Sequence, residues 1–116
     1  MKINTKKFAD EWIESWNSRD LDRILSDYSD NAEITTPMIK VALGIETGTL
    51  KGKEKIREYW EAALKKVPDL HFELKDVTEG VESVAIYYQS VLGKMAIEVM
   101  FFDEDGKINK VIAYYI

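Results

Sequence analysis

The sequence predicts the α+β fold class: a curved, mostly antiparallel sheet with three N-terminal helices packed on its concave face. Residues 1–66 show helical spacing of apolar side chains in three places, whereas residues 70–116 largely alternate and are divided by turn signals. Strands joined by short connections pair antiparallel. The tryptophans, Trp12, Trp16 and Trp60, lie in the helical part and need a concave surface to bury against.

The chain is expected to form one domain, residues 1–116, because domains usually contain about 50–250 residues. Hydrophobic residues make up 46% of the sequence, which is enough for one core. The sequence contains no cysteine, which excludes disulfides, thiolate nucleophiles and cysteine-ligated metals.

The net charge and the length of the apolar segments limit the partners and the cellular location that we expect. A net charge of −5 argues against a nucleic-acid partner, because phosphate binding depends on clustered lysine and arginine. No apolar run approaches the ~18 residues of a membrane span, so no membrane partner is expected. Residues 1–10 carry lysines without the apolar stretch of a secretory signal, so we expect a cytoplasmic protein.

The first helix is expected at residues 5–17, where Phe8, Trp12 and Trp16 recur every four residues. Asp20 is a good N-cap for a second, short helix. The apolar side of that second helix would hold Leu21, Ile24, Leu25 and Tyr28. The next elements are expected to be a turn at 29–31, a strand at 32–36 ended by Pro37, an irregular segment at 38–52 with a short strand at 45–50, and a helix at 53–66.

The remaining strands are expected at residues 70–77, 84–92, 94–102 and 107–116. If residues 103–106 form a four-residue hairpin loop, Phe102 pairs with Lys107, and Glu98 lies opposite Val111. One face then holds Ala96, Glu98, Met100, Phe102, Val111, Ala113 and Tyr115, and the other Ile97, Val99, Phe101, Ile112 and Tyr114. Both faces are apolar, so we expect helices on one face and a second copy of the chain, a homodimer, on the other.

Glu98 is the most informative residue for function. It is a lone carboxylate between Ile97 and Val99, and a buried charge is costly unless it is paired. Glu98 should therefore have a raised pKa, a hydrogen-bond partner or a water-filled cavity beside it. A carboxyl tuned in this way suits general acid/base catalysis, although a purely structural role is an equal alternative. If the turn around Gly93 is tight, Tyr87 lies opposite Glu98 and supplies a partner.

Aromatic residues on the helices are candidates for the wall of a ligand cavity, since such walls are rich in aromatics. Trp12 and Trp60 are expected to line it, whereas Trp16 is expected in the core. His71 is the only histidine and alternates with Phe72 on the polar side of a strand, so no histidine metal site is expected. The acidic run at 103–105 lacks the ligand spacing of a cation loop, and neither a metal nor a cofactor is expected.

Several short segments carry a resemblance to a known family: Tyr28–Ile34 followed by Pro37, Gly48–Gly52, Tyr59–Trp60, Glu98–Asp103 and Ala113–Tyr115. In their order and spacing they resemble the NTF2-like superfamily, in particular its SnoaL-like branch, over nearly the whole chain. The resemblance implies a cone-shaped α+β barrel (the NTF2-like or cystatin-like fold) with a pocket at the wide end, usually dimeric through the sheet. The superfamily includes ketosteroid isomerases, polyketide cyclases, epoxide hydrolases, dehydratases and non-catalytic binding modules, so the fold leaves function open.

The isomerase chemistry does not carry over residue by residue. The general base of those enzymes is an aspartate just before the proline, and Thr36 stands there. Their oxyanion tyrosine on the first helix is matched by Trp12, and their supporting tyrosines by Trp60 and Tyr28. Their acid on the penultimate strand is matched by Glu98. A threonine cannot abstract a carbon-bound proton unaided, so steroid-type isomerisation is not expected.

These observations lead to a hypothesis with an open alternative. The chain is interpreted as a SnoaL-like protein that binds a small apolar molecule, and as an enzyme it would catalyse a cofactor-independent isomerisation, cyclisation or dehydration with Glu98 as acid/base. The expected ligand-binding residues are Trp12, Tyr28, Thr36, Trp60, Tyr87, Met100 and Tyr115. The alternative is a non-catalytic small-ligand-binding module or a dimeric interaction module. Two or more titratable groups around open space would favour the enzyme.

Overall fold

A computed structural model describes residues 4–116 and confirms the α+β class. Six strands form one sheet in the order β2-β1-β6-β5-β4-β3, and every neighbouring pair is antiparallel except β1 and β6. The elements are α1 (Thr5–Ser18), α2 (Leu21–Leu25), β1 (Tyr28–Thr35), α3 (Pro37–Leu43), β2 (Thr49–Lys51), α4 (Lys53–Lys66), β3 (Glu73–Gly80), β4 (Ser83–Gln89), the 3-10 turn η1 (Val91–Gly93), β5 (Met95–Phe102) and β6 (Ile108–Tyr115).

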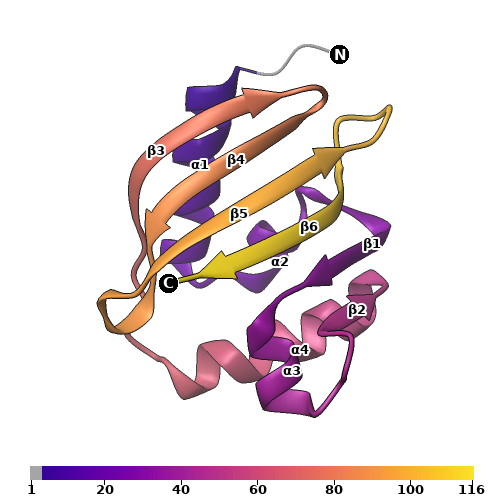
Figure 1. Cartoon of the computed structure of the whole chain (residues 1–116), viewed down its shortest axis with the longest axis vertical. Helices are drawn as coiled ribbons and strands as arrows, with labels where there is room; N and C mark the ends of the chain where they lie inside the picture. Colours follow the sequence, from indigo (N-terminus) through magenta and orange to yellow (C-terminus); the bar gives the residue numbers. More distant parts are fainter. Residues whose placement is uncertain (1–3) are drawn as a thin grey trace.

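The helices cover one face of the curved sheet. Helices α1 and α2 lie behind the strands in Figure 1, while α3 and α4 lie at the lower end, next to β1 and β2. The face of the sheet turned toward the viewer carries no helix. Within residues 4–116, no helix is long and apolar enough to cross a membrane.

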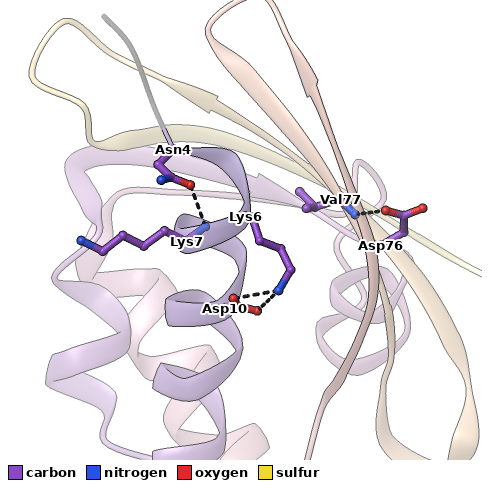
Figure 2. Close-up of polar contacts among 6 residues, drawn as sticks. All are labelled: Asn4, Lys6, Lys7, Asp10, Asp76 and Val77. Carbon is purple, nitrogen blue, oxygen red and sulfur yellow. Dashed lines mark hydrogen bonds and ion pairs between the residues drawn. The ribbon is translucent and has the colours of Figure 1, made fainter.

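Helix α1 begins where the sequence predicts. Asn4 caps it, because its side-chain oxygen accepts a hydrogen bond from the backbone N–H of Lys7 at 3.1 Å (Figure 2). Lys6 pairs with Asp10 one turn further on, at 2.7 Å, on the exposed side of the helix (Figure 2). The opposite side buries Ala9, Trp12, Ile13 and Trp16.

The tryptophans fill part of the concave space as an interlocked aromatic cluster. The Trp12 ring stacks on Phe72 with centroids 5.9 Å apart and meets the edge of Tyr88 at 5.2 Å. Trp16 meets Trp60 of α4 edge to face at 4.9 Å. Each of the tryptophans is at most 7% exposed, so the expectation that they bury against the sheet is confirmed.

A bulge in β3 contributes to the curvature that this cluster needs. The pairing of β3 with β4 slips between Leu74 and Asp76. At that point the Asp76 carboxylate accepts the backbone N–H of Val77 at 2.8 Å, beside α1 (Figure 2). An extra residue in one strand bends it and increases its twist, which helps to wrap the sheet around α1.

Three local predictions were wrong. Helix α3 was expected to be irregular chain, but Thr36 caps it by accepting the Met38 N–H at 3.1 Å, and Pro37 occupies the first helical turn. Residues 4–116 therefore contain four α-helices rather than the three predicted. Tyr28 begins β1 instead of ending α2. Residues 29–31 continue that strand through an irregular register and do not form the expected turn.

The β5–β6 register also differs from the prediction. Glu98 pairs with Ala113 rather than Val111, and Phe102 pairs with Ile108 rather than Lys107. An irregularity between Phe101 and Phe102 lengthens the connection. Because the shift at Glu98 is two residues, the side chains keep the faces that the sequence predicts.

Gly48 fixes the segment that returns from α3 to β2. Its carbonyl accepts the Thr36 N–H at 2.9 Å, and its φ is +66°. A Cβ added there would lie 3.0 Å from the Thr36 carbonyl oxygen. Gly44 has nearly the same φ, +67°, but nothing within 4 Å of the corresponding position.

We expect Gly48→Ala to lower the free energy of unfolding by about 2–3 kcal/mol, because left-handed strain and a backbone contact act together. Gly44→Ala, the matched control, should lose only about 1 kcal/mol, from strain alone. Urea unfolding of the two variants measures both values. Equal losses would show that the close approach at Thr36 is not a constraint.

Candidate functional site

An open cavity of about 990 Å³ lies between the lower end of the sheet and helices α3 and α4. Its apolar wall includes Trp16, Ile34, Leu50, Trp60, Leu70, Phe72, Val111 and Ala113. Polar groups also reach it, contributed by Thr36, Tyr59, Tyr88, Ser90, Glu98 and Tyr115. The cavity therefore combines a mainly apolar surface with a small set of oxygen groups, as small-molecule sites do.

Glu98 faces this cavity from the inner side of β5. Its strand neighbours on that face, Ala96 and Met100, are fully buried, while Glu98 keeps limited exposure through the cavity. The Tyr88 hydroxyl on β4 donates a hydrogen bond to Oε2 of Glu98. Burial raises the pKa of Glu98 to about 7, although the hydrogen bond from Tyr88 lowers it. Both the acid and the carboxylate are consequently populated near neutral pH.

Two further tyrosines are coupled electrostatically to this carboxyl. Burial, followed by the negative charge of Glu98, raises the pKa of Tyr115 to about 12. The same two causes raise the pKa of Tyr59. Both phenols line the cavity and keep their protons at neutral pH, so both are available there as O–H donors.

Thr36 adds a hydroxyl at the same end of the cavity. It is 8% exposed, and its oxygen accepts the Met38 N–H at the start of α3. Its side chain also interacts with Tyr115, which lowers the pKa of that phenol against the larger effect of burial. Thr36, which the resemblance to the isomerases aligned with their general base, thus carries a hydroxyl that caps α3.

The structure places four of the expected site residues at the cavity and three in the core. Glu98, Thr36, Trp60 and Tyr115 line the cavity. Trp12, Tyr28 and Met100 lie behind it, each at most 1% exposed. The Trp12 indole N–H donates to the Tyr28 hydroxyl at 3.1 Å, so their polar atoms pair with each other. Trp16 is in the buried core, as expected, and also forms part of the cavity wall.

The prediction that Tyr87 lies opposite Glu98 was wrong. Turn η1 sets the β4–β5 register so that Tyr87 pairs with Ile97 and Ile86 pairs with Glu98. Tyr87 therefore lies on the opposite face of the sheet, and Tyr88 reaches Glu98 along the inner face. The sequence did contain evidence for Tyr88. It alternates with Val84 and Ile86, which are both buried, so it lies on the same inner face of β4.

No group of three or more metal-ligating side chains occurs among the described residues 4–116. His71 is exposed, as expected, although it precedes β3 and does not lie in the strand predicted at residues 70–77. The oxygen groups of the cavity offer one carboxylate together with phenols and a hydroxyl. Their arrangement is suited to donating, accepting and relaying protons.

Comparison with known proteins establishes the family. The fold is shared with NTF2-like and cystatin-like structures, which defines the class of protein. The family model of the SnoaL-like domain matches residues 9–111 of the sequence, and the chain therefore belongs to this family. No curated protein is significantly similar to it in sequence.

Solved structures extend the comparison. A SnoaL-like protein of unknown function from Burkholderia thailandensis E264 is 45% identical, with a TM-score of 0.94 over 96% of this chain and 92% of the other. An NTF2-like protein of unknown function from Cytophaga hutchinsonii has 16% identity and a TM-score of 0.75 over 100% and 93%. SalBIII, an epoxide hydrolase/cyclase-like enzyme in pyran ring formation, has 20% identity and a TM-score of 0.73 over 96% and 89%. The last two likenesses concern the fold alone.

The Tyr88–Glu98 hydrogen bond gives a prediction about protonation. In Tyr88→Phe the carboxylate loses its donor, so the pKa of Glu98 should rise above the value of about 7. Tyr87→Phe, the matched control one residue away on the other face, should leave it unchanged. A titration of ¹³C-labelled glutamate carboxyls by NMR measures both. A shift caused by Tyr87→Phe instead would contradict the register described above.

Proposed function

We propose that this protein binds a small, largely apolar molecule in the cavity and catalyses a cofactor-independent proton transfer on it. Isomerisation, cyclisation and dehydration are the reaction types that such a transfer serves. The observation that carries the proposal is a carboxyl with a pKa near 7, Glu98, hydrogen-bonded to Tyr88 inside an open aromatic cavity. A general acid/base works best when its pKa is close to the working pH.

The proposed chemistry divides between Glu98 and the phenols. The carboxylate form of Glu98 takes a proton from the ligand, and the resulting carboxylic acid returns one to a second atom. Charge that develops on a ligand oxygen during the transfer would be stabilised by the O–H groups of Tyr59 and Tyr115. Tyr88 stays bonded to Glu98 and holds its carboxyl in position.

The alternative, a non-catalytic binding module, would need only one satisfied carboxylate. Three phenols whose pKa values respond to Glu98, those of Tyr59, Tyr88 and Tyr115, line the same open space. This number of titratable groups favours the enzyme. The likeness of the fold to SalBIII, a cyclase-like enzyme, agrees with ring-closing chemistry without specifying it here.

The test begins with native mass spectrometry of the freshly purified protein, which identifies a retained molecule. That molecule is then incubated with the protein in D₂O, and deuterium incorporation reports proton transfer whichever reaction follows. We expect exchange to rise with pH around the Glu98 pKa of about 7, because the carboxylate is the base. Glu98→Gln should lower the exchange rate by about 10²–10⁴-fold while retaining the ligand.

Two outcomes of this experiment would count against the proposal. Retention of the ligand with no exchange in the unaltered protein would establish the binding module instead. Unchanged exchange in Glu98→Gln would remove Glu98 from the reaction. Unfolding of the variant is checked by circular dichroism, and Glu98→Asp, which keeps the carboxyl, should recover part of the rate.

We also propose that a second copy of the chain covers the helix-free face of the sheet. Ile97 and Tyr114 pair across β5 and β6 on that face and are 38% and 55% exposed. Val99, Phe101 and Ile112 surround them and are partly buried. A contiguous apolar patch of this kind is typical of an interface.

The cytoplasmic location stays a prediction from the sequence.

Sedimentation equilibrium should show a dimer at micromolar concentration, since stable interfaces bury about 1,200–2,000 Å². Replacing Ile97 and Tyr114 together by lysine should give monomers, because both charges would be buried against the partner. Val81→Lys, at a site 92% exposed in the β3–β4 turn, is the matched control and should remain dimeric. A monomeric unaltered protein would point to a different partner for this face.

A further inference from the structure

The mouth of the cavity is bordered by a helix whose apolar side chains face water. Helix α3 buries Ile39 alone, whereas Met38, Val41 and Leu43 are 41%, 80% and 49% exposed. The same three side chains line the cavity. A ligand bound in the cavity could cover this apolar surface and remove it from water.

The buried and partly buried polar groups of the cavity mark its inner end. Thr36 and Tyr88 are buried, Glu98, Tyr59 and Tyr115 are partly buried, and all of them line the cavity. Its other charged residues, Lys55, Glu58 and Lys66, lie on α4 and are exposed. The causes of the pKa shift of Glu98 are burial and Tyr88, without a contribution from either lysine. The inner end therefore holds hydroxyls and one carboxyl that are sheltered from water, whereas the mouth combines the apolar side chains of α3 with the exposed charges of α4.

The inner end selects among ligand head groups by charge and by hydrogen bonding. An anionic head would meet the partly ionised Glu98 with no buried cation beside it. A cationic amine could pair with the ionised form of Glu98, but its charge would have to be desolvated, and it would give the O–H groups of Tyr59 and Tyr115 no acceptor. An uncharged oxygen, as in a ketone, aldehyde or alcohol, accepts from these donors and carries no charge to desolvate.

From the sheltered oxygen groups at one end and the apolar side chains of α3 at the other, we infer that the ligand is an elongated amphiphile, with an uncharged oxygen group next to Glu98 and an aliphatic chain that lies against Met38, Val41 and Leu43. The inference rests on the proposed function, because it names the substrate class for the same cavity. A volume of about 990 Å³ stands at the upper end of the usual range for ligand pockets, which leaves room for a chain as well as a head.

The chain length and the head group of the ligand can be tested together with a series of alkyl ketones and two charged analogues. The probes are 2-octanone, 2-decanone and 2-dodecanone, with dodecanoate and dodecylamine as charged analogues, and the readout is the fluorescence of Trp16 and Trp60 at the cavity wall. We expect affinity to rise by up to about fourfold for each methylene of the ketones. The dodecanone should bind at least about tenfold more tightly than either charged analogue, which corresponds to about 1.4 kcal/mol.

Val41→Asp tests the path of the chain. Its side chain is 80% exposed, so folding should be preserved, yet a charge there should abolish the gain between 2-octanone and 2-dodecanone. The matched control is Val81→Asp, the same change at an exposed valine in the β3–β4 turn, outside the cavity lining. It should leave the gain intact.

Failure of this inference can be told apart from failure of the proposed function. If both valine variants keep the chain-length gain, or if both lose it, the placement of the chain against α3 is wrong, whatever Glu98→Gln does to deuterium exchange. Equal or tighter binding of dodecanoate or dodecylamine would overturn the uncharged head group. A chain-length gain that depends on Val41, found in a protein without exchange activity, would support the inference and refute the catalysis.

Discussion

Tyr88 and Glu98 meet on the inner face of β4 and β5, where a phenol donates its hydrogen bond to a carboxyl that is largely buried beside the cavity. Two opposing effects act on that carboxyl. Desolvation favours its neutral form, and the hydrogen bond favours its charged form. Their balance sets a pKa near 7, so the chemistry of the cavity depends on the register that brings Tyr88, rather than Tyr87, to Glu98.

The concave space of the sheet divides into a packed part and an open part. Helix α1 fills the first with Trp12, whose neighbours Phe72 and Tyr28 are buried with it. Helices α3 and α4 border the second but leave it hollow. Tyr88 belongs to both parts, since its ring packs on Trp12 and its hydroxyl reaches Glu98. The aromatic cluster thereby positions the phenol whose hydrogen bond lowers the pKa of Glu98.

The periodicity of apolar residues predicted the elements that bury one face, and it missed the features that depend on local backbone geometry. Helix α1 could be predicted because Phe8, Trp12 and Trp16 form one apolar stripe. Helix α3 could not, since most of its apolar residues are exposed and no stripe results. The choice between Tyr87 and Tyr88 rests on turn η1, where Leu92 adopts a φ of 57° that its side chain gives no reason to expect. A shift of one residue there exchanged the two tyrosines between faces.

Glu98 conflicts with its surroundings in a way that the fold alone does not explain. Its cross-strand partners Ile86 and Ala113 are buried and apolar, as are Ala96 and Met100 on either side. An apolar residue would suit the sheet equally well and would avoid the cost of desolvating a carboxyl. Natural sequences break such local rules chiefly at functional sites. The cavity beside Glu98, with its phenols and its apolar mouth, supplies the chemical setting in which that cost is useful.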